Sequence, residues 1–164
     1  MHLPHPDVPA DVRPAHEIAV IGVGNTVAGD DGAGLEALRR IEARHRGNPR
    51  FLFHELHGDL YAISELLPLA RRFVFLDAVC GTPPGELVVT REAPRAHTPS
   101  FHQADIAAVM ATMERLGMTD QFPEWEIWGV AIDPPAELRI GLSPAVERGV
   151  TRLVDALDAM LRSL

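Results

Sequence analysis

Two carboxylates and one imidazole of this chain fall at positions where polar side chains can assemble a metal site. Asp31 opens the first predicted helix, Asp77 ends the third predicted strand, and His102 lies in the first turn of a later helix. In folds with a parallel sheet, such positions meet at one edge, at the carboxyl ends of the strands. Carboxylates and imidazole together bind divalent transition metals such as zinc, nickel and iron. The pattern therefore predicts a metal site with open coordination positions, in which a helix N-terminus keeps the imidazole neutral and able to bind.

Each of these residues also has an ordinary structural explanation, and the sequence leaves these alternatives open. Asp30 or Asp31 could cap the first helix, and Asp77 could stabilise a turn. His102 could cap its own helix or lie on the surface. The lone cysteine, Cys80, could act as a nucleophile, although a small buried side chain is the commoner role of such a residue. Only convergence in space would distinguish a site from separate structural roles.

Alternating apolar runs and amphipathic segments predict the elements that would position these residues. Residues 17–23 form a β-branched apolar run typical of a buried strand, and a glycine-rich loop, 22–34, leads from it into a helix that extends to about Arg46. Further strands are predicted at 51–56, 72–77, 86–90 and 125–131, and further helices at 59–69, from Ser100 and from Ser143. We therefore expect an α/β fold: a single three-layer domain with a mostly parallel, twisted five-stranded sheet, one edge strand, and helices on both faces.

Composition limits the classes of function and the organisation of the chain. The 164 residues carry 15 basic and 23 acidic side chains, a formal net charge of −8, so neither nucleic acid nor a membrane is an expected partner. Residues 1–16 hold four prolines and no apolar period, which predicts a flexible N-terminal extension before a domain at 17–164. A single cysteine and the lack of a signal-peptide pattern favour the cytoplasm.

Several common catalytic and nucleotide-binding motifs are absent. Val27 stands where the third glycine of a G-x-G-x-x-G dinucleotide motif would be, and no Gly-Lys-Ser/Thr phosphate loop occurs. The chain also lacks the G-x-S-x-G pattern of serine hydrolases and the His-Glu-x-x-His pattern of zinc peptidases. The chemistry must therefore come from another arrangement of residues.

The glycine-rich loop and four later segments resemble those of the hydrogenase maturation endopeptidases. The matching segments, which span about residues 17–162, are IGVGNTVAGDDGAG at 21–34, FLDAV at 75–79, HQ at 102–103, WGV at 128–130 and IGLSP at 140–144. Counting from Asn25 places the family's loop acid on Asp31 and leaves Asp30 as a structural partner.

The resemblance implies a cytoplasmic protease that removes the C-terminal peptide from the large subunit precursor of a nickel-iron hydrogenase after nickel insertion. The family's metal-contacting residues correspond to Asp31, Asp77 and His102, which would then be both catalytic and metal-binding. Nickel would be supplied by the precursor, although other divalent metals could occupy the site. We expect the chain to act as a monomer.

The resemblance is weaker in the loop after the second strand, and two other functions remain as alternatives. In the family this loop is usually richer in glycine, whereas here it contains His57, Gly58 and Asp59, the expected substrate contacts. One alternative is a non-catalytic nickel carrier or scaffold with the same three ligands. The other is a cysteine hydrolase that uses Cys80 as its nucleophile.

Overall fold

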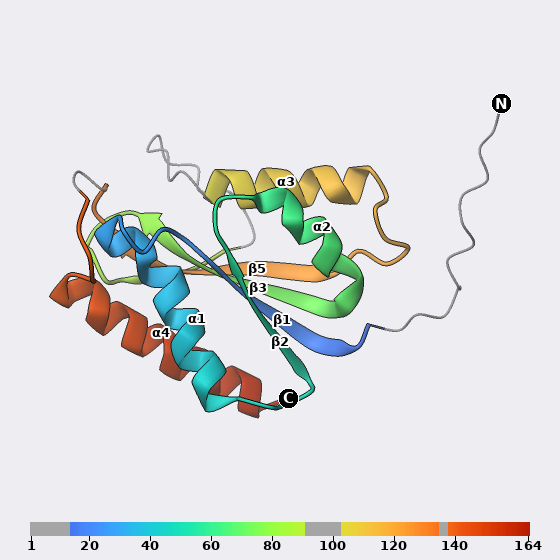
Figure 1. The fold of residues 1–164 in the computed structure, drawn as a ribbon, viewed down its shortest axis with the longest axis horizontal. Coiled ribbons are helices and arrows are strands. Elements are labelled where there is room, and N and C mark those ends of the chain that lie inside the picture. Colours follow the sequence, from blue (N-terminus) through green and yellow to red (C-terminus); the bar gives the residue numbers. More distant parts are fainter. Residues whose placement is uncertain (1–13, 91–102, 135–137) are drawn as a thin grey trace.

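A five-stranded sheet forms the centre of the molecule (Figure 1). The computed structural model describes residues 14–90, 103–134 and 138–164. The strands are β1 (His16–Val23), β2 (Phe51–Leu56), β3 (Ala70–Cys80), β4 (Leu87–Thr90) and β5 (Glu124–Ile132). They lie in the order β2-β1-β3-β5-β4, in which all neighbours are parallel except β4, which pairs antiparallel with β5. The predicted sheet, including its edge strand, is confirmed.

Helices cover both faces of the sheet, which confirms the predicted three layers. One face is covered by α1 (Ala33–Arg44) and α4 (Pro144–Arg162), and the other by α2 (Ile63–Leu66) and α3 (Gln103–Arg115) (Figure 1). In the part of the chain that the structure describes, no helix is both long and apolar enough to cross a bilayer.

The central strand β3 shows how the sheet fills both layers. Its side chains alternate between the two faces, as the pleat of a strand requires. Val74 and Leu76 pack with α1 and α4, whereas Phe73 and Phe75 pack with α2 and α3. Both faces are therefore buried, and this explains why the strand reads as one continuous apolar run. The same alternation turns the side chain of Asp77 toward the face that α2 and α3 cover.

The helix predicted at 59–69 is broken into three short pieces, so that prediction of one continuous helix is wrong. A 3₁₀ helix, η2 (Leu60–Ala62), precedes α2, and a second one, η3 (Leu67–Leu69), follows it. Pro68 lies inside η3, where its ring is incompatible with a longer α-helix. Several other bounds differ by one to three residues. The largest difference is in β3, which extends three residues beyond Asp77, and β1 begins one residue early at His16.

The sequence predicts N-terminal caps for two helices, at Ser100 and at Ser143, and the structure describes the second of these positions. The capping box at Ser100, like residues 1–13 of the predicted extension, lies outside the described residues. The start of α4 is confirmed: the side chain of Ser143 accepts a hydrogen bond from the Val146 N–H at 3.5 Å, and Pro144 occupies the first helical position.

The strand order reverses at the carboxyl ends of β1 and β3. After β1 the chain passes through α1 to β2 on one side, whereas after β3 it continues to β4 and β5 on the other. The connections therefore leave these two neighbouring strands in opposite directions. Such a reversal is the usual ligand-binding position in an open α/β sheet. In this chain the loop that contains Asp31 and the end of β3 that contains Asp77 meet there.

Candidate functional site

Asp77 is an acid in an apolar layer. Its side chain is 1% exposed, and the residue beside it on β5 is Gly129, which adds no side chain. Its Oδ1 accepts a hydrogen bond from the Ala78 N–H at 2.8 Å, which fixes the orientation of the carboxylate. Burial raises the pKa of Asp77 well above its ordinary value of 3.8; the Ala78 N–H opposes this rise, and the nearby Asp31 carboxylate adds to it. The structure thus brings the two predicted acids within electrostatic range of each other.

Asp31 comes from η1 (Gly29–Gly32), a 3₁₀ turn that joins the loop after β1 to α1. Its carbonyl oxygen accepts a hydrogen bond from the Asn25 N–H at 3.3 Å. Gly24 has φ +146°, and a Cβ built there would lie well under 3.0 Å from that same carbonyl oxygen. The glycine is therefore required both by its conformation and by the close approach of the turn. This packing fixes the position of the Asp31 backbone, from which its side chain extends.

The start of α1 lies unusually close to the sheet. A Cβ added at Gly34 would come well under 3.0 Å from the carbonyl oxygens of Leu76, within β3, and of Val23, the last residue of β1. At Gly22, an added Cβ would lie 2.8 Å from the Cβ of Leu38 in α1. Glycine at both positions lets the helix backbone approach the strand ends. We name η1, which contains Asp30 and Asp31, the acid turn. The close packing of α1 holds this turn beside β3.

Asp30 has a structural role, as the sequence count from Asn25 predicted. Its Oδ1 accepts hydrogen bonds from the Ser143 N–H at 2.5 Å and from Arg139 Nη2 at 3.3 Å. The Ser143 N–H lies at the N-terminus of α4, where the helix dipole favours a negative charge. Asp30 therefore ties the acid turn to α4, whereas its neighbour Asp31 is the acid whose charge acts on Asp77.

We expect this tether to contribute measurably to stability. Asp30→Ala removes both hydrogen bonds and should lower the free energy of unfolding by about 2 kcal/mol. Asp30→Asn keeps an acceptor oxygen for the Ser143 N–H and loses only the charge, so it should cost about half as much. Denaturant unfolding of both variants measures the difference. Equal losses in the two variants would contradict a tether that depends on the acceptor oxygen.

A second connection, which the sequence does not predict, joins the loop after β1 to the residues that precede α4. Ala28 and Arg139 form an isolated parallel bridge, in which the Gly29 N–H donates to the Arg139 carbonyl at 2.6 Å and the Arg139 N–H donates to the Val27 carbonyl at 3.2 Å. No local pattern marks this pairing, because its partners are more than a hundred residues apart. We name residues 138–140 the bridge segment.

The third predicted ligand, His102, lies outside the described residues. Helix α3, which begins at the next residue, packs on the face of the sheet toward which Asp77 points: Ile106 and Met110 share a core cluster with Phe75. Among the described residues there is no group of three or more His, Cys, Asp and Glu side chains that could hold a metal. A three-ligand site with His102 stays a prediction.

Cys80 is the last residue of β3 and is half-buried. Burial raises the pKa of its thiol, and the charges of Asp31 and Asp77 raise it further. Because the thiolate is the nucleophile, surroundings that favour the protonated thiol are the opposite of those found around catalytic cysteines. The structure therefore disfavours the cysteine hydrolase alternative.

The loop after β2 lies at the same edge of the sheet, since Leu56 pairs with Val23 at the end of β1. His57 is exposed, and its Nε2 lies 3.0 Å from Oε2 of Glu55. Asp59 caps η2 by accepting a hydrogen bond from the Tyr61 N–H at 3.0 Å. Gly58 has φ +84° and open space around it. Substrate contact by His57, Gly58 and Asp59 stays a prediction, to which the structure adds a capping role for Asp59.

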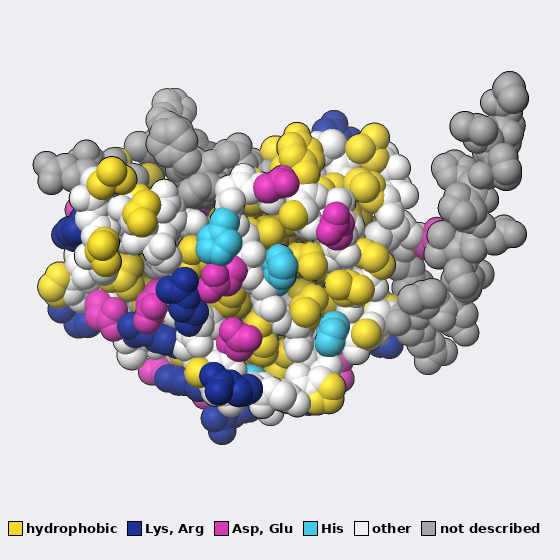
Figure 2. All heavy atoms as spheres, in the orientation of Figure 1, with side chains coloured by type: hydrophobic (Ala, Val, Ile, Leu, Met, Phe, Trp, Pro, Cys, Tyr) yellow, Lys and Arg dark blue, Asp and Glu magenta, His cyan; other side chains and the backbone are white. Residues whose placement is uncertain are grey.

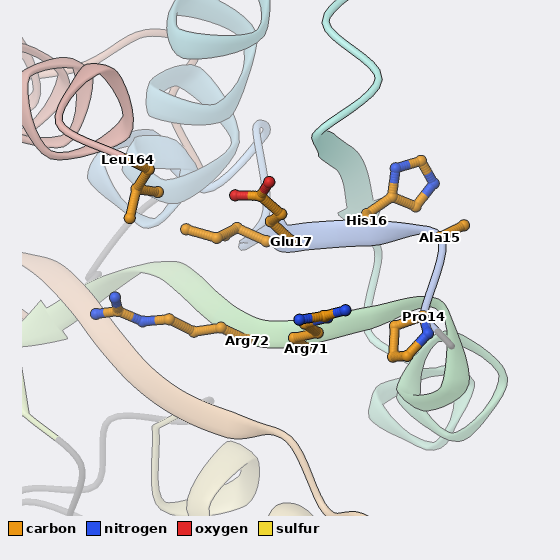
Figure 3. Close-up of a pocket in the computed structure, with 8 residues that line it drawn as sticks. Pro14, Ala15, His16, Glu17, Arg71, Arg72 and Leu164 are labelled. Carbon is orange, nitrogen blue, oxygen red and sulfur yellow. The ribbon is translucent and has the colours of Figure 1, made fainter. Parts of the chain in front are cut away.

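A shallow cavity of about 440 Å³ lies at the opposite ends of the strands, beside the amino ends of β1 and β3. Figure 3 shows Glu17 and Arg71 among its lining residues, together with Leu164, which follows α4. Because Asp31 and Asp77 lie at the carboxyl ends of the same strands, this cavity is separate from the candidate site.

The chain is similar to known proteins in both sequence and structure. No model of a protein family matches the chain. It is 29% identical over 147 residues to the hydrogenase expression/formation protein HupD of Bradyrhizobium diazoefficiens, covering 80% of this chain and 75% of that protein. The hydrogenase maturating endopeptidase HybD from E. coli has a similar structure, with a TM-score of 0.71, 24% identity, and coverage of 90% of this chain and 93% of that one. An endopeptidase from Escherichia coli matches with a TM-score of 0.69 and 27% identity over the same shares, 90% and 93%.

Proposed function

Because the chain belongs to the hydrogenase maturation endopeptidases and so acts as a peptidase in hydrogenase maturation, we propose that it removes the C-terminal peptide of a nickel-iron hydrogenase large subunit precursor after nickel has been inserted. The metal belongs to the substrate in this proposal. Asp31, Asp77 and His102 contact it when the precursor docks. A precursor without nickel would lack the group that these side chains recognise.

The observation that carries this proposal is that the Asp31 carboxylate lies within electrostatic range of the buried Asp77 carboxylate. Burial and the neighbouring Asp31 charge both make ionised Asp77 unfavourable in the protein alone. A divalent cation between two such carboxylates would relieve their repulsion and replace the lost hydration. The donor set, two hard carboxylates with an imidazole as third ligand, suits a transition metal with open positions. The acids are therefore suited to receive a metal that arrives with the substrate.

The three side chains would have different roles, ligand or proton acceptor, because their surroundings differ. Asp77, buried and oriented by the Ala78 N–H, would act as a fixed ligand. Asp31 is the less buried of the two acids, so its carboxylate oxygens are better placed to accept a proton from the attacking water. Neutral His102 would donate a ring nitrogen as ligand. A metal held in this way polarises a carbonyl group or lowers the pKa of bound water.

A processing assay tests this proposal. Purified protein is incubated with nickel-loaded or nickel-free large subunit precursor, and the loss of the C-terminal peptide is read by mass spectrometry. We expect cleavage of the loaded precursor alone, with a loss of at least about 100-fold in rate for both Asp77→Asn and His102→Ala. Cys80→Ala is the matched control at the end of the same strand, and it should retain full activity.

Two outcomes would overturn the proposal. Equal cleavage of nickel-free precursor would remove the role of the metal in recognition. Intact precursor in every sample, together with nickel bound by the protein itself, would instead support the carrier alternative.

A further inference from the structure

The bridge segment exposes two large apolar side chains beside the candidate site. Leu138 is 84% exposed and Ile140 is 89% exposed, the two highest values for large hydrophobic side chains in the described residues. Val27, on the other side of the bridge, is 53% exposed. Figure 2 shows hydrophobic side chains gathered at this end of the molecule, over the start of α1 and the segment that leads into α4. Such a cluster next to a site indicates a surface that a partner covers.

The exposure follows from how the bridge segment is held. The Arg139 backbone pairs with Val27 and Gly29, and its side chain reaches Asp30. The residues on either side of Arg139 hold their side chains in solvent, whereas the Arg139 side chain bonds to Asp30. The segment thus directs its charged residue toward the protein and its apolar residues toward solvent.

The main chain of the bridge segment is also open on its outer side. Within the described residues, neither Leu138 nor Ile140 takes part in a backbone hydrogen bond. An extended segment with apolar side chains and an unpaired edge can bind another extended chain through main-chain hydrogen bonds and side-chain pockets. A helical or a rigid globular partner would leave these backbone groups unsatisfied.

The charge of this surface suits an apolar ligand. The only charged side chain in residues 138–143 is Arg139, which is paired with Asp30 at 3.3 Å. The cluster therefore presents no uncompensated charge that would select an acidic or a basic peptide. Ala28, the bridge partner of Arg139, lies three residues before Asp31 in the chain, so a chain bound here passes next to the acids.

We propose that Val27, Leu138 and Ile140 form the docking surface for an extended apolar segment of the precursor that adjoins the cleaved bond. This inference rests on the proposed function, since it names where that substrate binds. The surface selects the precursor polypeptide, whereas the acids select its metal.

The double variant Leu138→Ser/Ile140→Ser tests the surface. Both side chains are exposed, so folding should be unaffected. We expect KM for loaded precursor to rise about tenfold or more, with kcat within about twofold of the wild-type value. Leu116→Ser is the matched control: this side chain is 71% exposed but follows the far end of α3, at the opposite edge of the sheet. The control should leave KM and kcat unchanged.

A binding measurement separates failure of this inference from failure of the proposed function. The Kd of catalytically inactive Asp77→Asn protein for the precursor is compared with and without the two serine substitutions, by calorimetry. Weaker binding by about tenfold supports the surface even if the wild-type protein cleaves nothing. Unchanged Kd and KM in the double variant would overturn it, whatever the activity. A wild-type dimer that becomes monomeric in the double variant would also overturn it, because a second copy would then be the occupant.

Discussion

Asp77→Asn should unfold at a higher temperature than the wild-type protein at neutral pH, while losing the ability to process precursor. The amide keeps an oxygen that can accept the Ala78 hydrogen bond, and it removes a carboxylate whose charge is disfavoured by burial and by Asp31. Replacing a buried charge without disturbing its packing commonly stabilises a protein by about 1–3 kcal/mol. Near neutral pH this corresponds to a rise in Tm of roughly 5 °C for a chain of this size.

The stabilisation should depend on pH in a defined direction. The folded-state pKa of Asp77 is raised well above 3.8, so the folded protein holds this proton more strongly than the unfolded chain does. The free energy of unfolding of the wild-type protein therefore falls as pH rises from about 4 through the folded-state pKa. Asp77→Asn lacks this decrease. The two proteins should have similar stability near pH 4 and diverge as the pH approaches neutrality.

Thermal unfolding at several pH values, with and without added Ni²⁺, measures both effects. The ion should raise the Tm of the wild-type protein, because it binds the folded state alone, and should leave Asp77→Asn unchanged. A variant less stable than the wild-type protein at neutral pH would show that the carboxylate stabilises the fold, which contradicts the balance of burial and charge described above.

Gly34→Ala should be strongly destabilising, although the substitution lies in a helix. Helix propensity alone favours alanine over glycine by about 1 kcal/mol. A Cβ at this position would overlap the carbonyl oxygens of Leu76 and Val23, which belong to the sheet and cannot move aside. The start of α1 must then shift, and we expect a net loss of about 3 kcal/mol, or roughly 10 °C in Tm.

Gly81→Ala is the matched control for this substitution. An added Cβ at Gly81 would lie 3.8 Å from the Cβ of Ala131, an ordinary van der Waals distance, and the backbone there does not require glycine. Its stability should stay within about 0.5 kcal/mol of the wild-type value. Calorimetry of both variants checks the comparison. A mild effect at Gly34 would mean that α1 is free to move relative to β3.

Local pattern was sufficient for most of the fold, because each strand is a short apolar run bounded by turn residues. The strand at 51–56 was predicted with its observed bounds, and β4 was recognised as the edge. Pattern failed where packing decides the outcome. Residues 59–69 contain enough apolar positions for a helix, but Pro68 and the short connection to β3 divide them. The extension of β3 to Cys80 depends on pairing with Ile132, which local sequence does not reveal.

The candidate site could be predicted only in part for the same reason. The positions of Asp31 and Asp77 at strand and helix ends followed from element order, and the structure brings these two acids together. The resemblance distinguished Asp30 from Asp31, but the contacts of Asp30 with Arg139 and Ser143 span 109 and 113 residues, so no local pattern reveals what the tethering acid binds. The exposure of Leu138 and Ile140 likewise results from the bridge to Ala28, a purely tertiary pairing.

The link between Asp30 and the N-terminus of α4 also determines when the site can form as the chain is synthesised. The ribosome delivers the glycine-rich loop among the first residues, yet the Ser143 N–H that anchors this loop is delivered only after all five strands have been made. A nascent chain therefore carries its acid turn without its anchor for most of translation. The position of the acid turn in the folded protein is thus fixed only after β5 has been made and α4 has begun.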